Sequence, residues 1–275
     1  MKLISILGCG WLGLPLAKSL LEKGFSVKGS TTSLNKIPIL QNIGIEAFKI
    51  EVSETEIKGD VNSFLENSEI LIIDIPPKLR SVSGENFIGK IQNLIPFIEK
   101  SSVAKIIFVS STSVYADDNS MVSEDTKPQP KTESGKQLLK AENLLQSNKN
   151  FRSTILRFGG LIGENRHPIH FLAGKQNLEN PEAPINLIHQ TDCIGIIETI
   201  IERGHRQAQF DNINNNEVFN AVAPFHPSRA IYYSQKAIEL GLPLPEFAHG
   251  ISVGKTIMSN KIENVLNYEF KNNLQ

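Results

Sequence analysis

The sequence predicts an α/β fold in which a doubly wound parallel sheet is followed by a smaller C-terminal lobe. Short apolar runs recur through the first 158 residues, and each has the length of a buried parallel strand. Stretches rich in helix-forming residues separate these runs, so strand and helix alternate four times before residue 110. Such alternation is typical of parallel sheets with helices on both faces. We therefore expect one α/β domain over residues 1–158 and a second lobe over residues 159–275.

The expected elements follow one another closely along the chain. The first strand, residues 2–7, leads into a helix over 14–23 that ends at Gly24. The segment 87–100 has apolar residues at helical spacing, which predicts a helix with one face toward the core. Residues 117–131, rich in Pro, Ser and Asp, are expected to form a surface loop. The other strands are expected at 25–29, 45–50, 70–75, 105–110, 153–158 and 217–221, and the other helices at 34–42, 61–65, 191–203, 228–240 and 260–266.

The turn between the first strand and the first helix is rich in glycine. In this setting Gly8 makes the tight turn, Gly10 lets the backbone approach a pyrophosphate, and Gly13 lets the helix pack closely on the strand. The helix N-terminus also offers free N–H groups and a positive dipole end to an anion. The motif predicts a Rossmann-type dinucleotide site formed by these three glycines with Trp11 and Leu12; an ordinary packing turn is the alternative.

The end of the second strand indicates which dinucleotide is bound. A site that prefers NAD usually has an acidic residue about 20 residues beyond the glycine turn, on the ribose 2′-hydroxyl. This chain has Ser30, Thr31 and Thr32 there instead, with Lys28 and Lys36 nearby. Hydroxyls and a cation suit a 2′-phosphate, so we expect NADP in preference to NAD. NAD stays open because no arginine marks the pocket, and Ser33 has the alternative role of capping the next helix.

The fourth strand is also expected to end at the cofactor. In open α/β sheets, ligands bind outside the carboxyl ends of the strands. Residues 70–75 form this strand and a Pro-Pro pair follows it, so we expect Pro76 to border the cofactor crevice.

Composition narrows the class of protein. The formal net charge of −1 gives no indication of nucleic acid or an anionic membrane surface as a partner. The two cysteines, Cys9 and Cys193, are too few for a disulfide framework or a cysteine zinc site. His167 and His170 lack neighbouring cysteines or paired carboxylates, so no metal is expected. No apolar run approaches the roughly 20 residues of a membrane span, and the N-terminus has no signal-peptide layout, so we expect a cytoplasmic protein.

Several motifs occur in order along the chain: GCGWLG (8–13), VSSTSVY (109–115), Glu124-Asp125, Pro128, LRFGGLIG (156–163), NLIHQTD (186–192) and GKTIMSN (254–260). The chain is similar to the extended short-chain dehydrogenase/reductase superfamily, the group of NAD(P)-dependent sugar-nucleotide epimerases and dehydratases. The C-terminal GKTIMSN resembles the corresponding segment of one atypical subgroup, the YeeZ-like proteins. The resemblance covers nearly the whole chain and implies that the second lobe binds substrate over the cofactor crevice and packs partly back on the sheet.

This chain differs from catalytic members of the family at the two residues that transfer the proton. Catalytic members carry a tyrosine four residues before a lysine on the helix after the fifth strand. The tyrosine exchanges a proton with the substrate hydroxyl, and the lysine and the nicotinamide ring lower its pKa. The matching positions in this chain hold Ser134 and Leu138. Lys136 does not replace the lysine, because it points roughly 200° around the helix from Leu138. We therefore expect the usual proton transfer not to operate.

Ser111 and Tyr115 are the remaining catalytic candidates. Ser111 matches the family hydroxyl that bonds the reacting oxygen of the substrate; a serine that satisfies backbone at a strand end is the alternative. Tyr115 would line the crevice or pack structurally beside the loop. Arg157 would meet a phosphate or carboxylate, or form a structural ion pair. Thr191 or Asp192 is expected to cap the helix that begins there.

Two functions from different classes follow. The first is an oxidoreductase of the epimerase/dehydratase type, acting on a nucleotide sugar or another hydroxyl or carbonyl compound. Tyr115, His189 or a water would then replace the missing tyrosine. The alternative is a non-catalytic protein that binds NADP(H) as a sensor or regulatory ligand. In either case we expect a monomer or homodimer with a small-molecule partner and without nucleic acid or membrane.

Overall fold

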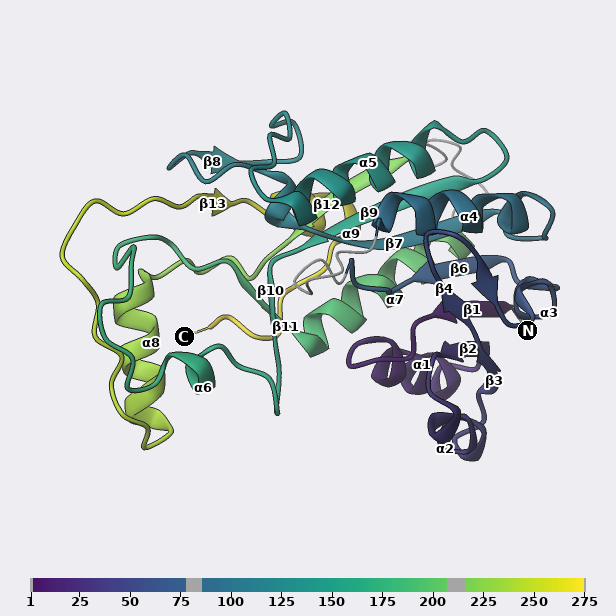
Figure 1. Ribbon diagram of the computed structural model, residues 1–275, viewed down its shortest axis with the longest axis horizontal. Helices are drawn as coiled ribbons and strands as arrows, with labels where there is room; N and C mark the ends of the chain where they lie inside the picture. The colour runs from purple at the N-terminus through teal and green to yellow at the C-terminus, as the bar shows by residue number, and fades with distance from the viewer. Residues whose placement is uncertain (1, 78–85, 207–215, 275) are drawn as a thin grey trace.

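A computed structural model describes residues 2–77, 86–206 and 216–274 of the chain (Figure 1). Its centre is a seven-stranded sheet in the order β12–β9–β7–β6–β1–β2–β3. Every neighbouring pair in this sheet is parallel, which confirms the predicted doubly wound, Rossmann-type arrangement. The strands are β1 (Leu3–Leu7), β2 (Ser26–Thr31), β3 (Glu46–Lys49), β6 (Ile70–Ile73), β7 (Lys105–Ser111), β9 (Arg152–Phe158) and β12 (Glu217–Ala221).

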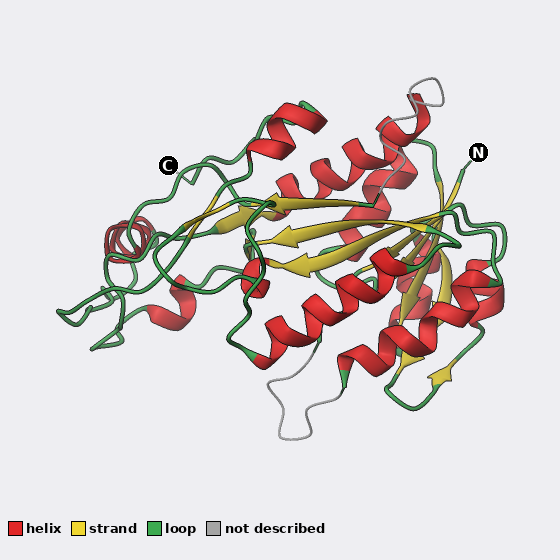
Figure 2. Cartoon of the chain, turned by 90° about the horizontal axis from the view of Figure 1, so that it is seen from above, coloured by secondary structure: helices red, strands yellow, loops and turns green. Residues whose placement is uncertain are grey.

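Helices cover both faces of this sheet (Figures 1 and 2). Because successive residues of a strand point to opposite faces, each strand contributes to two separate apolar cores. The core on one face includes residues of α1, α2, α7 and α9, and the core on the other includes residues of α3, α4 and α5. The helices are α1 (Gly13–Glu22), α2 (Ile37–Asn42), α3 (Val61–Leu65), α4 (Phe87–Glu99), α5 (Glu133–Ser147), α7 (Gln190–Arg206) and α9 (Asn260–Leu266), with short 3-10 helices η1 (Leu34–Lys36) and η2 (Thr112–Val114).

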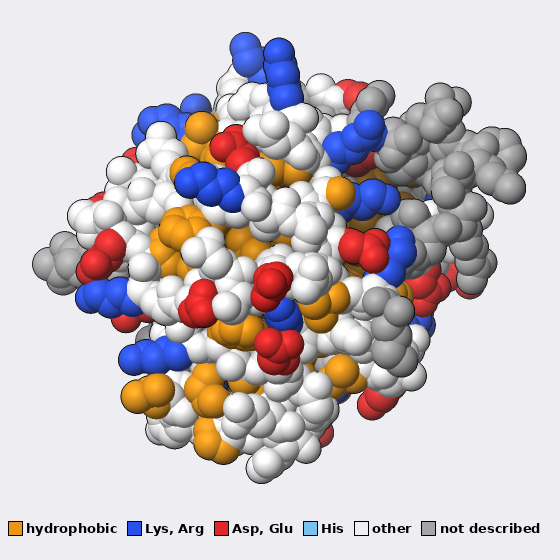
Figure 3. All heavy atoms as spheres, turned by 90° about the vertical axis from the view of Figure 1, so that its right-hand side faces the viewer, with side chains coloured by type: hydrophobic (Ala, Val, Ile, Leu, Met, Phe, Trp, Pro, Cys, Tyr) orange, Lys and Arg blue, Asp and Glu red, His pale blue; other side chains and the backbone are white. Residues whose placement is uncertain are grey.

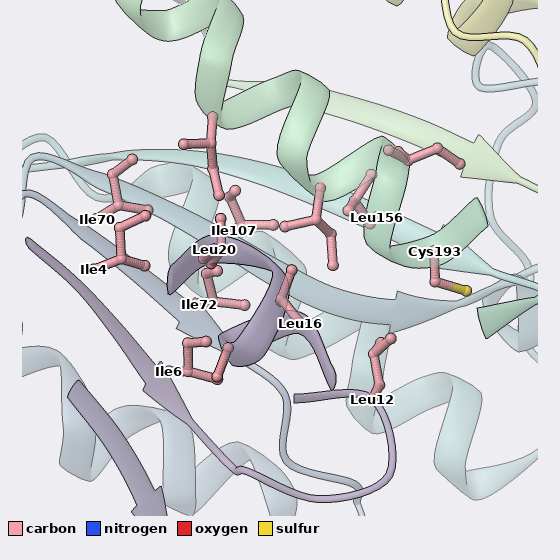
Figure 4. Close-up of a cluster of buried hydrophobic side chains, with 14 of the residues drawn as sticks. Ile4, Ile6, Leu12, Leu16, Leu20, Ile70, Ile72, Ile107, Leu156 and Cys193 are labelled. Atoms are coloured by element: carbon pink, nitrogen blue, oxygen red, sulfur yellow. The ribbon is translucent and has the colours of Figure 1, made fainter. Parts of the chain in front are cut away.

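The core beneath α1 holds the glycine turn in place. Leu16 and Leu20 of α1 point toward the apolar side chains of β1 and β6, and Leu12, just before the helix, belongs to the same buried cluster (Figure 4). Cys193 of α7 joins the same buried cluster. Burial raises the pKa of the Cys193 thiol well above its usual value, so this cysteine is an inert packing residue. The start of α1 is therefore anchored to the sheet.

Three short strand pairs were not predicted. β4 (Glu51–Val52) pairs with β5 (Ile57–Lys58), β8 (Met121–Val122) pairs with β13 (Thr256–Ile257), and β10 (Gly160–Ile162) pairs with β11 (Leu187–His189). The expected loop over 117–131 therefore contains a strand, and the glycine segment 159–163 contains one too. Strands of two or three residues are too short to show a hydrophobic period.

The second lobe lies beyond the carboxyl ends of the sheet strands (Figure 2). It has an apolar cluster of its own, in which Ile162 of β10 and Ile169 of α6 (Ile169–Leu172) meet Tyr232 and Tyr233 of α8 (Arg229–Glu239). Other parts of the C-terminal half return to the main sheet: β12 pairs with β9, and α7 joins the core of α1. Residues 159–274 therefore contribute both to the lobe and to the sheet.

A histidine in the lobe core makes this region acid-sensitive. Nδ1 of His167 accepts the N–H of Ile169 at 3.1 Å, so the ring is neutral and its Nε2–H donates to the Tyr232 hydroxyl at 3.0 Å. Burial lowers the pKa of His167 to about 4, below the unfolded value of about 6.5. Protonation therefore favours the unfolded lobe, and we expect its stability to fall as the pH drops from about 6.5 through about 4.

Hydrogen exchange in α8 measures this effect, because protection of its amides should decrease across that pH range. His167→Gln should flatten the decrease. An unchanged acid transition in this variant would contradict the assignment.

The outer surface gives little indication of function. On the face shown in Figure 3, basic and acidic side chains are interspersed. Within the described ranges no helix is long and apolar enough to cross a bilayer. Across the same ranges no group of three or more His, Cys, Asp or Glu side chains is gathered to hold a metal ion. We therefore expect the functional site at the carboxyl edge of the sheet, where ligands bind in this topology.

Candidate dinucleotide site

Two glycines of the turn have no room for a side chain, whereas the third lies next to free space. A Cβ on Gly8, whose φ is +109°, would lie 2.3 Å from the carbonyl oxygen of Asp74. A Cβ on Gly13 would lie 2.2 Å from the carbonyl oxygen of Gly8. Neither position has room for a side chain. A Cβ on Gly10, in contrast, would have no atom within 4 Å, so the turn opens to free space at this residue.

Two backbone donors follow Gly10 directly in the chain. The N–H groups of Trp11 and Leu12 have no hydrogen-bond acceptor among the described residues, whereas that of Cys9 donates to the Ser30 carbonyl at 2.8 Å. They stand at the N-terminus of the ten-residue helix α1, where the helix dipole favours an anion. Free donors beside an open glycine are what a pyrophosphate requires. The residues present therefore fit the predicted dinucleotide.

Two hydroxyl residues at the end of β2 accept hydrogen bonds from the backbone of the site, and the third is exposed to solvent. Oγ of Ser30 accepts the Gly8 N–H at 3.0 Å, and Oγ1 of Thr31 accepts the Ser33 N–H at 3.2 Å. Thr32 is exposed. Ser33 makes no side-chain cap of η1. Ser30 and Thr31 therefore support the backbone of the site. They also lie at the strand end where the sequence predicts the adenosine ribose to bind.

Lys28 does not supply the cation that the sequence placed near the ribose. Its side chain is buried, and Nζ donates to the carbonyl oxygens of Ser63 at 2.6 Å and Glu66 at 2.9 Å. These carbonyls lie at the C-terminal end of α3, where helices favour a cation. Lys28 points to this face because it alternates with Val27, which lies in the other core. Lys36, in contrast, is exposed beside the site. Burial raises the pKa of the nearby Cys9 thiol to about 12, and the charge of Lys36 lowers that pKa in part.

Sequence reasoning missed Asp74, which lies directly beneath the turn. It follows β6, and its Oδ2 lies 3.2 Å from where a Cβ of Gly13 would stand. Burial raises the pKa of Asp74 to about 7, although the Gly13 N–H and the Arg166 cation both act to lower it. An acidic residue at the carboxyl end of a buried strand was the available signal. Pro76, the residue predicted to border the crevice, is exposed beyond the end of β6.

Asp74 makes anion binding at the turn depend on pH. A bound pyrophosphate favours the neutral carboxyl, so we expect the affinity for a dinucleotide to decrease as the pH rises through about 7. Cys9 and Cys193 also act here, and burial raises the pKa of both thiols, so they stay neutral across this range. Calorimetric titrations at several pH values measure the slope. It should flatten in Asp74→Asn, and an equally steep slope in that variant would contradict the role of Asp74.

Tyr115 belongs to a buried polar network and does not face the crevice. Its side chain is 2% exposed, and its hydroxyl accepts from Nη1 of Arg157 at 2.5 Å and donates to Oδ1 of Asn220 at 3.0 Å. Burial raises the pKa of the phenol. Arg157 also forms an ion pair with Glu142, with Nη2 and Oε2 2.6 Å apart. Tyr115 therefore has the structural position considered for it in the sequence, and Arg157 has its structural ion pair.

Ser111 stands at the carboxyl end of β7, half-buried. Its Oγ accepts the N–H of Ser113 at 3.1 Å and thereby caps η2. The hydroxyl proton is not used by this bond, so the side chain can still donate to a ligand.

Known proteins resemble this chain in sequence and in fold. A family profile described as NAD(P)H-binding matches residues 8–186. The chain belongs to this family. Protein YeeZ of Escherichia coli strain K12 is 34% identical over 275 residues, covering 98% of this chain and 96% of that protein. An uncharacterized UDP-glucose epimerase, YtcB of Bacillus subtilis strain 168, is 25% identical over 79% of this chain and 78% of its own length.

Solved structures show the same fold. UDP-glucuronic acid 4-epimerase from Bacillus cereus, in complex with UDP-glucuronic acid and NAD, superposes with a TM-score of 0.78 at 18% identity, over 99% of this chain and 95% of that one. Together these matches confirm the resemblance to the epimerase/dehydratase branch of the short-chain dehydrogenase/reductase superfamily and to its YeeZ-like members.

In this NAD(P)H-binding protein, helix α5 begins against the loop that follows β7. Gly135 packs so closely that a Cβ would lie 2.2 Å from the Ser113 carbonyl oxygen. Its neighbour Ser134 is half-buried, and Leu138, one turn later, is 3% exposed within an apolar core. Lys136 is exposed. The two positions assigned to the family's tyrosine and lysine thus carry a hydroxyl and a core leucine.

The C-terminal motif of this NAD(P)H-binding protein supports the same loop. Nζ of Lys255 donates to the Tyr115 carbonyl at 2.8 Å and forms an ion pair with Asp117 at 3.1 Å. Asn186 holds the segment through its side chain, which donates to the Lys255 carbonyl at 2.8 Å and accepts from the Ile257 N–H at 2.9 Å. The motif was recognised in the sequence, but its contact with this loop was not predicted.

Asp192, a candidate helix cap, holds the chain end instead. Its buried carboxylate accepts from the Tyr268 hydroxyl at 2.9 Å, from the Lys271 N–H at 2.7 Å and from Asn272. At the start of α7 the Thr191 N–H donates to Nδ1 of His189 at 3.2 Å.

Proposed function

We propose that this chain binds NADP(H) at the glycine turn as a regulatory or sensing ligand, without the Tyr–Lys proton transfer of its catalytic relatives. The observation that carries the proposal is the contrast between the two ends of the site. The turn has an open Gly10 and the free N–H groups of Trp11 and Leu12. At the other end, α5 offers Ser134 and Leu138 in place of an acid–base pair.

The side chains of the site favour binding over proton exchange. The Tyr115 hydroxyl already donates to Asn220 and accepts from Arg157, so it has no donor left for a substrate. Asp74, whose pKa is raised to about 7, lies beneath the glycine turn, where the pyrophosphate would be. When bound, the cofactor would supply hydride chemistry; the residues described would bind and orient it.

The preference for NADP rests on the end of β2. This end has hydroxyls and the exposed Lys36, and it lacks the acidic residue that would bind a free 2′-hydroxyl. We expect NADPH to bind more tightly than NADH. Lys36→Ala should weaken NADPH binding by roughly 10-fold, as expected for one charge-assisted contact, and leave NADH unchanged. Tighter binding of NADH to the unmodified protein would contradict the preference.

A second candidate is an oxidoreductase that acts on a nucleotide sugar. Ser111 favours it, because this hydroxyl retains a proton to donate at the carboxyl end of β7. Two of the similar proteins are a UDP-glucose epimerase and a UDP-glucuronic acid 4-epimerase, and their names suggest the substrate class.

Turnover assays separate the two candidates. Purified protein with NADPH or NADP⁺ is incubated with UDP-sugars and with small aldehydes. The absorbance of the reduced nicotinamide and the amount of epimerised sugar are then measured. The proposal predicts saturable cofactor binding without turnover. Turnover that disappears in Ser111→Ala would establish the oxidoreductase instead.

A further inference from the structure

The loop after β10 brings an arginine from the second lobe to the glycine turn. Gly163 and Arg166 close this loop with reciprocal backbone hydrogen bonds of 2.9 and 3.0 Å. The guanidinium carbon of Arg166 lies 4.8 Å from the ring centroid of Trp11, which belongs to the turn. Gly163 packs on the same ring, so closely that a Cβ there would lie 2.8 Å from it. Nε2 of Gln190, the first residue of α7, donates to the Trp11 carbonyl at 2.6 Å, so segments that follow β9 in the chain hold both the ring and the backbone of Trp11.

The guanidinium of Arg166 is uncommitted. It is exposed, and it makes no hydrogen bond or ion pair with any residue in the described parts of the chain. Its charge nevertheless acts on Asp74 and Cys193, which both lie beneath the turn. Stacking on an aromatic face leaves the N–H donors at the edge of the guanidinium available. Within the described residues, the Arg166 cation on the Trp11 ring therefore has no ion-pair partner, and the adjacent N–H groups of Trp11 and Leu12 have no acceptor.

We propose that Arg166 is a cofactor-binding residue, which pairs with the pyrophosphate of the dinucleotide while Trp11 holds its guanidinium in place. This inference rests on dinucleotide binding at the glycine turn. A planar guanidinium can donate two parallel hydrogen bonds to phosphate oxygens, and the Trp11 ring restricts its orientation before the ligand arrives. The positive charge also offsets the Asp74 carboxylate, which would otherwise repel the anion.

The position of Arg166 in the chain implies that its contact with the pyrophosphate would also connect two parts of the fold. The residue belongs to the loop after β10, whereas the turn belongs to the strand β1 and the helix α1. A pyrophosphate held from both sides would fasten the second lobe to the sheet. Cofactor binding should then increase hydrogen-exchange protection of residues 163–166 in the unmodified protein, and much less in Arg166→Ala.

Calorimetric titration with NADPH tests the proposal. Arg166→Ala should raise the dissociation constant roughly 10- to 100-fold, and Arg166→Lys should give an intermediate loss because it keeps the charge but not the planar donors. The matched control is Arg229→Ala, which removes another arginine stacked on an aromatic ring, Phe247, at 5.9 Å within the second lobe. It should bind as the unmodified protein does. Trp11 is the one tryptophan of the chain, so its emission reports directly on the loss of the stacked cation.

The outcomes separate this inference from the proposed function. If the unmodified protein binds neither NADPH nor NADH, dinucleotide binding itself fails. If it binds NADPH and Arg166→Ala binds equally well, or if Arg229→Ala loses as much, only the role of Arg166 is overturned. The salt dependence gives an independent reading, since removing one phosphate contact should reduce the slope of affinity against ionic strength.

Discussion

Replacing Gly10 by alanine is expected to abolish tight dinucleotide binding and to leave the fold intact. The added Cβ would meet no protein atom within 4 Å, and Gly10 is absent from the glycines with positive φ, so the free protein accepts it without strain. The same Cβ would occupy the space where a pyrophosphate approaches the backbone. Loss of the contacts from the Trp11 and Leu12 N–H groups should weaken binding by about 100-fold or more. Titration with NADPH followed by Trp11 fluorescence measures the loss.

Gly13→Ala provides the contrast. Its Cβ would lie 2.2 Å from the Gly8 carbonyl oxygen, so this variant should lower the melting temperature as well as the affinity. Gly10→Ala should melt as the unmodified protein does. Unchanged affinity in Gly10→Ala would show that the turn serves packing alone.

Arg157→Ala is expected to cause the largest loss of stability. Arg157 is 4% exposed and Glu142 is 0% exposed, and Nη2 and Nε of the arginine both donate to the carboxylate. Removing the arginine leaves a buried carboxylate whose one remaining partner among the described residues is the Ser110 hydroxyl, at 2.5 Å. Loss of one member of a buried ion pair typically costs about 3–5 kcal/mol in the free energy of unfolding. Urea denaturation measures this change.

The exposed pair Lys236–Glu239 is the matched control. Its lysine and carboxylate lie 2.5 Å apart on α8, with side chains 30% and 55% exposed. Lys236→Ala should change the free energy of unfolding by less than about 1 kcal/mol. A similarly small change in Arg157→Ala would contradict the assignment of Arg157 and Glu142 as a buried structural pair.

The sheet could be predicted from the sequence because buried parallel strands are short apolar runs. Residues 70–75, for example, were expected as a strand, and Ile70–Ile73 is one with every side chain buried. The helix over 61–65 was predicted at its observed bounds. The pairing of β8 with β13 was not predictable, since it joins two-residue segments more than 130 positions apart and neither shows a period.

The site was predictable where one residue type determines the geometry. Gly8 and Gly13 stand where no side chain fits, and the sequence motif identified both. The direction of long side chains was not predictable: Lys28 was placed at the ribose, yet it binds the end of α3 on the opposite side of its strand. Arg166 was missed because its relation to Trp11 is formed by a loop that folds back from the second lobe.

Calorimetric titration of the unmodified protein with NADPH, and separately with NADH, tests the central claim most directly. We predict saturable binding of one dinucleotide per chain, tighter for NADPH, that weakens as the pH rises through about 7. Absence of binding at millimolar concentrations of both dinucleotides would contradict it.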